Sequence, residues 1–380
     1  MTQYKNGKGH EDKQTDSGDF ELVNLNSISI DGGFKHSGKF INESDDGILY
    51  KNDLVMILSD VGHGDLLGRV ALIPDDNKFI LNQRVALLRP NKTANPEFLF
   101  FYINSHQKYF KSQGAGMSQL NISKKSVETF SSLVPNIDEQ KKISLFLMKL
   151  DSLIALHQRK LEHLQEQKKG LLQKMFPKNG EIVPEVRFPG FTDAWEQRKW
   201  ADSINISNEM VDPTTGKFDD MPHIAPGNIE SFTGRILDNV KTVKEEELIS
   251  GKFLFKPGDV VFGKINPQLG KYFYARVEGL TSADSYVLNG KNKNITQKFI
   301  FLLLQTRDFF KYSVSVSKRS GIPKINREEL NGYKFLIPYK EEQEKIGDFF
   351  LNIDSLITLH QRKLDHLELM KKGLLQQMFV

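Results

Sequence analysis

Polar and basic side chains gather in two loops, one in each half of the chain, at residues 112–121 and 315–324. Gln and Asn form paired hydrogen bonds with adenine, Arg and Lys pair with guanine, and Ser, Gly and backbone amides suit phosphates. Ser123 and Asn326 follow as expected N-caps of short helices, whose positive ends would point to the same side. Solvated surface loops have a similar composition. The candidate DNA contacts in these loops are Gly116, Ser118, Gln119, Asn121, Lys318, Arg319 and Lys324.

Basic and amide side chains also lie where we expect strands to end. The first half carries them in one short run, and the second half carries them directly after a buried apolar stretch. Ordinary strand ends have the same composition, so both interpretations stay open at this stage. The additional candidate DNA contacts are Asn82, Gln83, Arg84, Lys264, Asn266, Gln268, Lys271 and Tyr272.

Motifs for catalysis or cofactor binding are incomplete in this sequence. It has no cysteine, which excludes disulfides, cysteine-ligated zinc, iron–sulfur clusters and thiol nucleophiles, and its nine histidines include no HExxH motif. A phosphate-loop pattern from Gly258 to Lys264 is followed by Ile265 instead of a magnesium-binding Ser or Thr. Asn266-Pro267 lacks the second proline and the aromatic ring of the adenine-methyltransferase motif. We therefore predict no catalytic residue, no metal site and no cofactor in this chain.

Length and composition indicate a protein of more than one globular domain. The chain has 380 residues, of which 39% are hydrophobic and 26% charged. The 52 basic and 48 acidic residues give a net charge of +4, so a nucleic-acid surface would have to be local. The polar start, and the lack of any apolar run near the roughly 18 residues of a membrane helix, predict a cytoplasmic protein without a membrane partner.

An internal repeat organises the chain. Residues 135–176 recur at 338–379 with a constant offset of 203, and 26 of the 42 aligned residues are identical. Each copy follows a more variable segment with one short buried strand, at 53–57 or 259–262, and apolar core helices, within 98–111 or 299–311. The sequence therefore predicts two related variable units, each followed by a long helix.

Apolar residues in each repeated segment recur at steps of four and three, the spacing of a coiled-coil seam. We predict that the two helices pair antiparallel as a rod of about 50 Å. His157 and His360 are equivalent seam residues, better explained by helix register than by catalysis. Lys168 and Lys371 also fall on the seam. The residues predicted to pair the helices or dock a partner are Ile143, Leu147, Leu150, Ile154, His157, Leu161, Leu164, Leu171, Ile346, Phe350, Ile353, Ile357, His360, Leu364, Leu367 and Leu374.

The apolar stripe beside the seam is wider than a two-stranded coil requires, so a further helix is expected to pack there. The flanking residues are Phe146, Leu153, Leu156, Leu172, Phe349, Leu356, Leu359 and Leu375.

The predicted fold class is α+β, with two globular domains of mixed strands and helices separated by two long helices in an antiparallel coiled coil. This pattern has approximate two-fold internal symmetry. Prolines and glycines prevent residues 177–190 from continuing the helix, and the first 18 residues have so few apolar side chains that we expect a frayed tail. The predicted segments are a polar tail at 1–18, domain 1 at 19–135, helix 1 at 136–176, a linker at 177–190, domain 2 at 191–338 and helix 2 at 339–380.

Several motifs resemble those of the specificity subunit of type I restriction–modification enzymes. They are the run from Gly116 to Ile122, the Leu-Val-Pro and Leu-Ile-Pro exits, the Glu-Gln-x-Lys-Ile helix starts and the Leu-Leu-Gln-x-Met-Phe ends. The resemblance covers essentially the whole chain. Residues 187–191 with Trp195-Glu196 look like the family's opening of a recognition domain, and no such opening precedes Phe20.

This resemblance implies a non-catalytic, DNA-binding subunit with two target-recognition domains, each reading one half of a bipartite, non-palindromic site. It also implies that the helices dock two methyltransferase subunits, which hold S-adenosylmethionine, and that a full complex adds helicase–nuclease restriction subunits. The alternative is a coiled-coil adaptor whose variable domains bind a ligand other than DNA, such as a peptide or carbohydrate, without salt-dependent DNA affinity. A self-contained methyltransferase or nuclease would need motifs that this sequence lacks.

Overall fold

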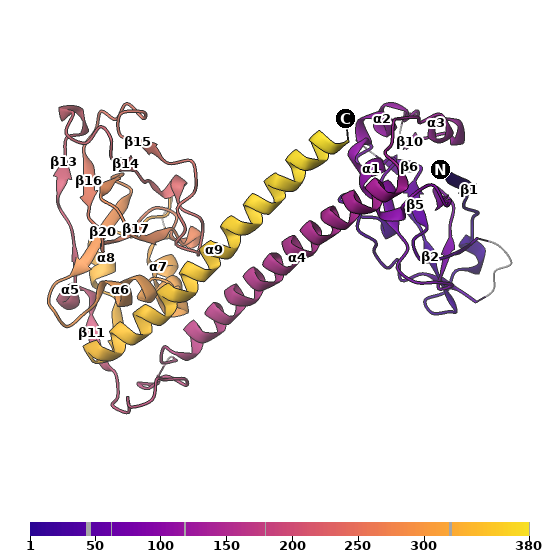
Figure 1. Ribbon diagram of the computed structural model, residues 1–380. Coiled ribbons are helices and arrows are strands. Elements are labelled where there is room, and N and C mark those ends of the chain that lie inside the picture. Colours follow the sequence, from indigo (N-terminus) through magenta and orange to yellow (C-terminus); the bar gives the residue numbers. More distant parts are fainter. Residues whose placement is uncertain (43–46, 62, 118, 179, 319–320, 380) are drawn as a thin grey trace. The chain divides into compact units, whose positions relative to one another are not determined.

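The computed structural model describes residues 1–42, 47–61, 63–117, 119–178, 180–318 and 321–379. The chain forms two compact units, labelled by element in Figure 1. Unit 1 is Met1–His157 together with Lys363–Val380, and unit 2 is Gln158–Arg362. Each of the two long helices, α4 (Ile137–Lys174) and α9 (Lys340–Met378), therefore contributes residues to both units.

Unit 1 combines three sheets with short helices in its described part. The sheets have the orders β1-β9-β5-β7, β3-β2-β8-β4 and β10-β6. The strands are β1 (Thr2–Asn6), β2 (Phe20–Val23), β3 (Phe40–Ile41), β4 (Ile48–Leu49), β5 (Leu54–Ile57), β6 (Ser59–Val61), β7 (Val70–Leu72), β8 (Phe79–Leu81), β9 (Val85–Pro90) and β10 (Gln119–Asn121). The helices are α1 (Pro96–Ser105), α2 (Gln107–Ser112) and α3 (Lys124–Glu128), with 3-10 turns η1 (Glu11–Lys13) and η2 (Leu25–Ser27).

Unit 2 repeats this plan. Its described sheets have the orders β12-β20-β17-β18, β13-β16-β19-β14-β15 and β11-β21. The strands are β11 (Glu196–Lys199), β12 (Ile204–Ile206), β13 (Met210–Val211), β14 (Pro222–His223), β15 (Lys241–Thr242), β16 (Lys252–Phe255), β17 (Val260–Gly263), β18 (Tyr272–Tyr274), β19 (Gly279–Thr281), β20 (Ser285–Gly290) and β21 (Lys334–Ile337). The helices are α5 (Trp200–Ser203), α6 (Gln297–Leu303), α7 (Arg307–Val316) and α8 (Arg327–Asn331), with 3-10 turns η3 (Pro213–Thr215), η4 (Pro226–Asn228) and η5 (Pro267–Leu269).

The predicted strands and core helices are confirmed. Strand β5 is buried on both faces: Leu54 and Met56 pack with the aromatic residues of α1, and Val55 and Ile57 face the β2-β8 sheet. Burial on both faces explains its uninterrupted apolar run, because a half-exposed strand would alternate with polar residues. Strand β17 is buried on both faces in the same way. The mixed α and β composition of both units confirms the predicted fold class.

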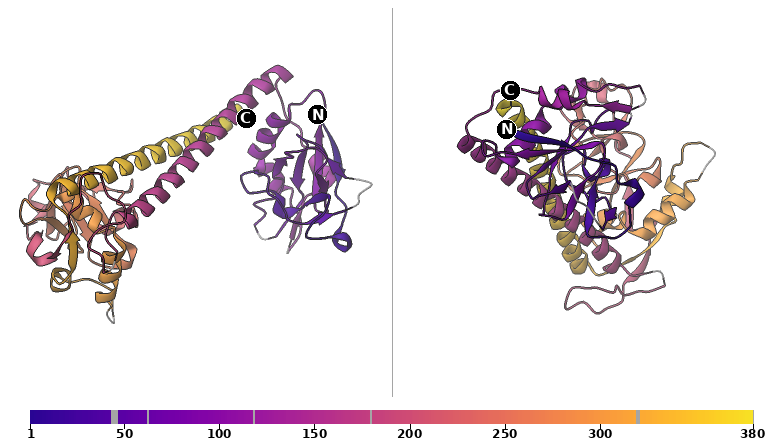
Figure 2. Two further views of the ribbon diagram at one scale, coloured as in Figure 1. Left: turned by 90° about the horizontal axis from the view of Figure 1, so that it is seen from below. Right: turned by 90° about the vertical axis from the view of Figure 1, so that its right-hand side faces the viewer.

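The two long helices run antiparallel where they meet within each unit. In unit 1 Lys371 Nζ lies 2.5 Å from Asp151 Oδ1, and in unit 2 Lys168 Nζ lies 2.6 Å from Asp354 Oδ1. From Asp151 to Lys168 the position on α4 advances by 17 residues while the partner on α9 moves back by 17. The left view of Figure 2 shows the yellow α9 beside the magenta α4 within unit 2. All sixteen residues predicted to pair the helices or dock a partner are buried or half-buried.

One glutamine of each repeat clamps the start of its long helix onto the preceding domain. In unit 1 Gln140 accepts a hydrogen bond from Asn95 N at 2.9 Å and donates to Pro135 O at 2.9 Å. Gln343 makes the same two bonds in unit 2, from Thr296 N and to Pro338 O. Both glutamines are almost fully buried, so the repeated Glu-Gln-x-Lys-Ile motif is an anchor between helix and domain.

The prediction of a frayed amino-terminal tail is wrong. Strand β1 pairs antiparallel with β9, from Thr2 opposite Pro90 to Asn6 opposite Ala86, and Tyr4 packs against the core. Thr15 bridges to Phe40 further along. Backbone hydrogen bonds pair a strand at the edge of a sheet with its neighbour. A polar segment in which only one aromatic side chain faces the core can therefore join the sheet without an alternating apolar pattern.

Candidate functional site

Three segments meet at one edge of unit 1. We name this edge loop edge 1; its described residues are 58–61 and 63–66, 82–84, and 115–117 with 119–121. Leu58 N donates to Arg84 O at 2.9 Å, and Ile122 N donates to Leu58 O at 2.8 Å. Strands β6 and β10 then pair antiparallel, so that Asn121 lies opposite Ser59. The structure therefore brings the two predicted patches of the first half together on either side of a segment that the sequence analysis did not select.

The buried hydroxyl of Ser59 holds the two predicted amide side chains of loop edge 1. Ser59 Oγ donates to Asn121 Oδ1 at 2.6 Å and accepts from Gln119 Nε2. Asn121 is exposed, whereas Gln119 is half-buried. Gly116 has φ of +138°, and a Cβ there would lie 1.9 Å from Gln119 O, so only glycine fits this turn.

The turn at 82–84 separates into an exposed and a buried part. Arg84 is exposed, with φ of +65°, a backbone region that non-glycine residues seldom adopt. Gln83 is half-buried. Asn82 is only 5% exposed, and its Oδ1 accepts from Gln83 N at 2.9 Å, so the prediction that Asn82 contacts DNA is wrong. Its side chain shapes the turn that presents Arg84.

Unit 2 has the same arrangement, which we name loop edge 2; its described residues are 264–271, 282–284, and 318 with 321–324. Lys264 N donates to Asp284 O at 2.8 Å, and Ile325 N donates to Lys264 O at 3.0 Å. Asn266 N also donates to Pro323 O at 2.7 Å. These bonds repeat those around Leu58 in unit 1 and join the two predicted patches of the second half into one surface.

Two cations lie near an aromatic ring next to loop edge 2. Lys264 Nζ lies 5.4 Å from the centroid of the Tyr286 ring, and Arg327 Cζ lies 5.7 Å from it. Burial raises the pKa of the Tyr286 hydroxyl, which donates to Ile325 O at 3.2 Å and stays neutral. Exposed Lys318, Lys324 and Gln268 extend this basic surface, and Asn266 sits beside it with φ of +48°.

Two predicted contacts of unit 2 are turned inward. Tyr272 is 4% exposed, its hydroxyl donates to Phe232 O at 2.9 Å, and burial raises its pKa, so the prediction that it contacts DNA is wrong. Lys271 is half-buried and its Nζ donates to Ile229 O, which directs the charge toward the protein. Ser118 and Arg319 lie outside the described residues.

Sequence reasoning missed two residues of these edges. Asp284 occupies in unit 2 the turn that Arg84 occupies in unit 1, and it is exposed. Aligning the two halves at β9 and β20 would have found it, because the following strands begin at Val85 and Ser285. Ser59 had no such signal, since a single serine after a strand is common. A carboxylate can accept a hydrogen bond from the amino group of cytosine. The chemistry of Asp284 is therefore as compatible with a base contact as that of a lysine or an arginine.

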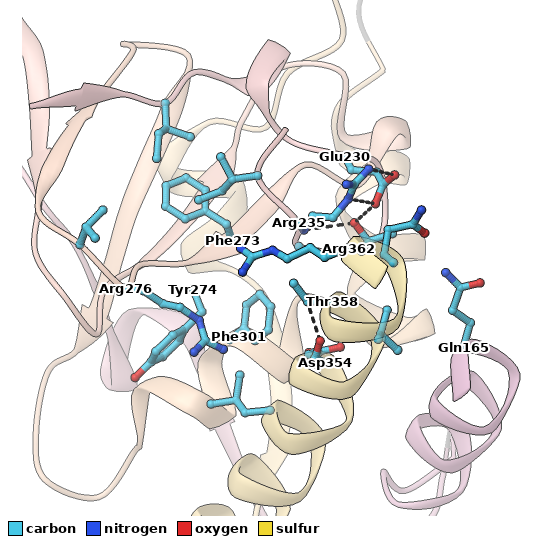
Figure 3. Close-up of a pocket in the computed structure, with 18 of the residues that line it drawn as sticks. Gln165, Glu230, Arg235, Phe273, Tyr274, Arg276, Phe301, Asp354, Thr358 and Arg362 are labelled. Atoms are coloured by element: carbon cyan, nitrogen blue, oxygen red, sulfur yellow. Dashed lines mark hydrogen bonds and ion pairs between the residues drawn. The ribbon is translucent and has the colours of Figure 1, made fainter. Parts of the chain in front are cut away.

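A pocket of about 360 Å³ lies elsewhere in unit 2, between the domain and α9 (Figure 3). Its lining includes Arg276, the ion-paired Arg235 and Glu230, and Asp354. Burial raises the pKa of Asp354 although Lys168 lies 2.6 Å away, and Asp354 Oδ2 is buried without a hydrogen-bond partner among the described residues. None of the predicted DNA contacts lines this pocket, which we treat as distinct from the loop edges.

The described residues contain no group of three or more acidic, histidine or cysteine side chains that could hold a metal ion. The helices in the described part of the chain are each too short or too polar to cross a membrane.

Comparison with known proteins finds one family for both halves of the chain. The profile described as "Type I restriction modification DNA specificity domain" matches residues 3–166 and again residues 193–369. Each match covers one variable unit and most of the repeated helix that follows it.

Relatives with curated descriptions are specificity subunits. The "Type I restriction enzyme EcoDI specificity subunit" of Escherichia coli is 27% identical over 297 residues, 71% of this chain and 65% of that protein. The MjaVIII specificity subunit of Methanocaldococcus jannaschii is 24% identical over 348 residues, 86% of this chain and 78% of that protein. The match thus spans less than two thirds of the E. coli protein. Among solved structures, the type I restriction–modification S subunit of M. genitalium has a TM-score of 0.61 at 15% identity, covering 100% of this chain and 94% of that one, so it has the same fold.

Proposed function

This chain belongs to the family of type I restriction–modification DNA specificity proteins, and on that premise we propose that it selects the DNA sequence on which such a complex acts. In this proposal each unit reads one half of a bipartite, non-palindromic site through its own loop edge. The chain itself is non-catalytic. It works in the cytoplasm, where the target DNA is accessible.

The observation that carries this proposal is that the two loop edges share the same backbone hydrogen bonds but expose different side chains. The backbone bonds around Leu58 in unit 1 recur around Lys264 in unit 2. Their exposed groups differ: Arg84 and Asn121 in the first, and Asp284 and Lys318 in the second. Base edges in the major groove are distinguished by such donors and acceptors, so two equivalent edges with different side chains suit two different half-sites.

The partners in this proposal are two methyltransferase subunits, which supply S-adenosylmethionine, and restriction subunits in a full complex. Exposed leucines beside the seam support docking of partner helices: Leu153 and Leu156 are 45% and 39% exposed, and the equivalent Leu356 and Leu359 are each 46% exposed. Leucines at matching places on both helices form apolar surface that the seam leaves uncovered.

The test of DNA selection uses the chain purified with its methyltransferase partner. Fluorescence anisotropy over a salt series should show affinity that falls steeply as salt rises, because bound phosphates release counterions, and methylome sequencing should return one bipartite motif. Salt-independent or absent DNA binding by the assembled complex would favour the adaptor alternative.

The docking surface is tested by co-purification. Leu153→Asp with Leu156→Asp, and Leu356→Asp with Leu359→Asp, should each remove one methyltransferase copy without changing the melting temperature, since these side chains are already exposed. Ile249→Asp is the matched control, because Ile249 is an exposed apolar residue in a loop of unit 2. Full partner binding by both leucine variants would contradict docking on this stripe.

A further inference from the structure

One position of the two loop edges differs in chemistry between the units. The backbone bonds described above make Ile325 the counterpart of Ile122. Three residues earlier, unit 1 has Gln119 and unit 2 has Ile322. Unit 2 therefore carries an aliphatic side chain where unit 1 carries an amide that donates and accepts hydrogen bonds.

The segment that pairs next to this position changes in the same way. In unit 1 Ser59 pairs with Asn121, and the Ser59 hydroxyl accepts a hydrogen bond from Gln119 Nε2. In unit 2 the equivalent antiparallel bridge joins Ile265 and Lys324, and Ile265 is half-buried. A hydrogen-bonded serine and glutamine in unit 1 are thus replaced by two isoleucines in unit 2.

The second of these isoleucines gains little from packing within its own domain. Ile322 is 67% exposed, whereas Gln119 is half-buried. The β-branched side chain of Ile322 has few rotamers, and the following Pro323 restricts its backbone. Pro323 O accepts a hydrogen bond from Asn266 N at 2.7 Å, which joins the segment to the neighbouring loop. The structure therefore presents a stiff apolar side chain to solvent.

Two further large apolar side chains are exposed beside this segment. Leu269 is 44% exposed, and its backbone N donates to Asn266 O at 2.8 Å. Phe232 is 52% exposed, and its backbone N donates to Gly270 O at 2.9 Å. Single exposed apolar residues are common on protein surfaces, but three on segments joined by backbone bonds indicate an apolar contact surface.

Charged and amide side chains lie in the same edge. The exposed ones include Lys318, Lys324, Gln268 and Asp284. Lysines bind phosphates, and all of these side chains can form hydrogen bonds with base edges, but an apolar side chain can do neither. The apolar group that a base displays in the major groove is the 5-methyl group of thymine. An apolar surface within a basic DNA-reading edge therefore matches the chemistry of thymine.

We propose that Ile322 and Leu269 form a contact site for the 5-methyl group of one thymine in the half-site that unit 2 reads. This inference rests on the proposed function and adds to it a named chemical feature of the target. Cytosine, the other pyrimidine, displays an amino group and no methyl group in unmodified DNA. The contact therefore selects thymine over cytosine at one position of the motif.

The test uses the chain purified with its methyltransferase partner and fluorescent duplexes that carry the motif found by methylome sequencing. Each thymine of the motif is replaced in turn by deoxyuracil, which lacks only the 5-methyl group. One replacement should weaken binding by the wild-type complex about fourfold in anisotropy titrations, as expected for one buried methyl group.

Substitution of the isoleucine should remove this difference. Complexes with Ile322→Ala, or with Ile322→Gln, which introduces the residue of unit 1, should bind the thymine and uracil duplexes within about twofold of each other. The Ile322→Ala complex should bind the uracil duplex as tightly as the wild type does. Ile249→Ala is the matched control, because Ile249 is an exposed isoleucine outside loop edge 2, and it should keep the fourfold difference.

Three results would overturn the thymine contact and leave the proposed function in place. They are a bipartite motif in which no deoxyuracil replacement changes affinity or no thymine occurs, a fourfold difference that persists in both Ile322 variants, and weaker binding of the uracil duplex by Ile322→Ala than by the wild type. Absence of salt-dependent, bipartite DNA selection by the wild-type complex would overturn both the contact and the proposed function.

Discussion

Arg84 and Asp284 occupy equivalent turns with opposite charge, so in the proposed function we predict that single side chains at these turns contribute to specificity. The backbone carbonyl of each turn accepts a hydrogen bond from the neighbouring segment, from Leu58 N in unit 1 and from Lys264 N in unit 2. This backbone bond does not involve the side chain, so we expect substitution at an exposed edge residue to leave the fold intact.

Substitutions at the two loop edges should alter different halves of the DNA motif. Asn121→Ala should relax one position in one half at a cost of about 1–3 kcal/mol if it contacts a base edge. Lys318→Ala should affect only the other half if the lysine contacts a base. If Lys318 binds a phosphate, the substitution should weaken binding to all sequences alike and lower the slope of log affinity against log salt concentration by about one. Methylome sequencing and salt titration of the assembled complexes measure both effects.

Lys92→Ala, an exposed lysine of unit 1 outside loop edge 1, is the control for these substitutions. A single edge variant that rewrites both halves of the motif would contradict one edge per half-site.

Asp354 should make unit 2 more stable as the pH falls, opposite to an ordinary surface ion pair. Burial raises the pKa of this carboxyl above 3.8 in the folded chain. At a pH just above the ordinary carboxyl pKa, the folded chain therefore binds more protons at this group than the unfolded chain does. The wild type gains stability as the pH falls through this window. The free energy of unfolding of wild type minus that of Asp354→Asn should therefore increase from about pH 7 to about pH 4.

Urea unfolding followed by tryptophan fluorescence measures this difference in unit 2 alone. The chain has two tryptophans, Trp195 and Trp200, and both are buried in unit 2. A difference that shrinks on acidification would show that attraction to Lys168 outweighs burial.

At the scale of the elements, the antiparallel seam ties each unit together. Leu161 in unit 2 and Leu364 in unit 1 are each 5% exposed. Leu161→Glu or Leu364→Glu would bury a carboxylate among apolar side chains without a partner, and each should cost about 2–5 kcal/mol. Leu356→Glu, on the exposed face of α9, should change stability by less than about 0.5 kcal/mol.

Tryptophan fluorescence measures the unfolding of the Leu161→Glu variant in unit 2. Calorimetry measures the melting of the Leu364→Glu variant in unit 1. Unchanged unfolding of both seam variants would contradict the seam.

At the scale of the whole molecule, α4 and α9 are continuous helices that each contribute residues to both units. In the proposed function we predict that the length of these helices sets the gap between the half-sites. Insertions near Gln173 or Gln376 would disturb the adjacent core residues Leu172 and Leu375. Seven residues inserted after Gln158 in α4 and after Lys363 in α9 keep the seam in register. The insertion adds about 10 Å at about 1.5 Å per residue.

The tolerated spacer should then lengthen by about three base pairs, at about 3.4 Å each, with both half-sites unchanged. Methylome sequencing of the complex with the double insertion checks this, and an insertion in α4 alone is the control, because it shifts the seam and should reduce stability. An unchanged spacer with the double insertion would contradict the prediction that helix length sets the gap between the half-sites.

The sequence by itself determined the repeat, the long helices, their seam and the buried strands. These features are encoded locally, by periodic apolar residues or by direct comparison of two copies of one segment. Strand β5 illustrates this, since four successive apolar residues leave no solvent face. The caps Ser123 and Asn326 were equally local and are confirmed, each accepting from a backbone N–H three residues on.

Only the tertiary structure decided which of the polar residues reach solvent together. Asn82 and Tyr272 have side chains suited to DNA, yet hydrogen bonds bury the first in its own turn and join the second to Phe232 O, 40 residues away. The grouping of the three segments of loop edge 1 likewise depends on backbone pairing between residues far apart in the sequence, and β1 depends on β9. Such pairing leaves no periodic trace in the sequence, because backbone groups are the same at every residue and the fold alone chooses their partners.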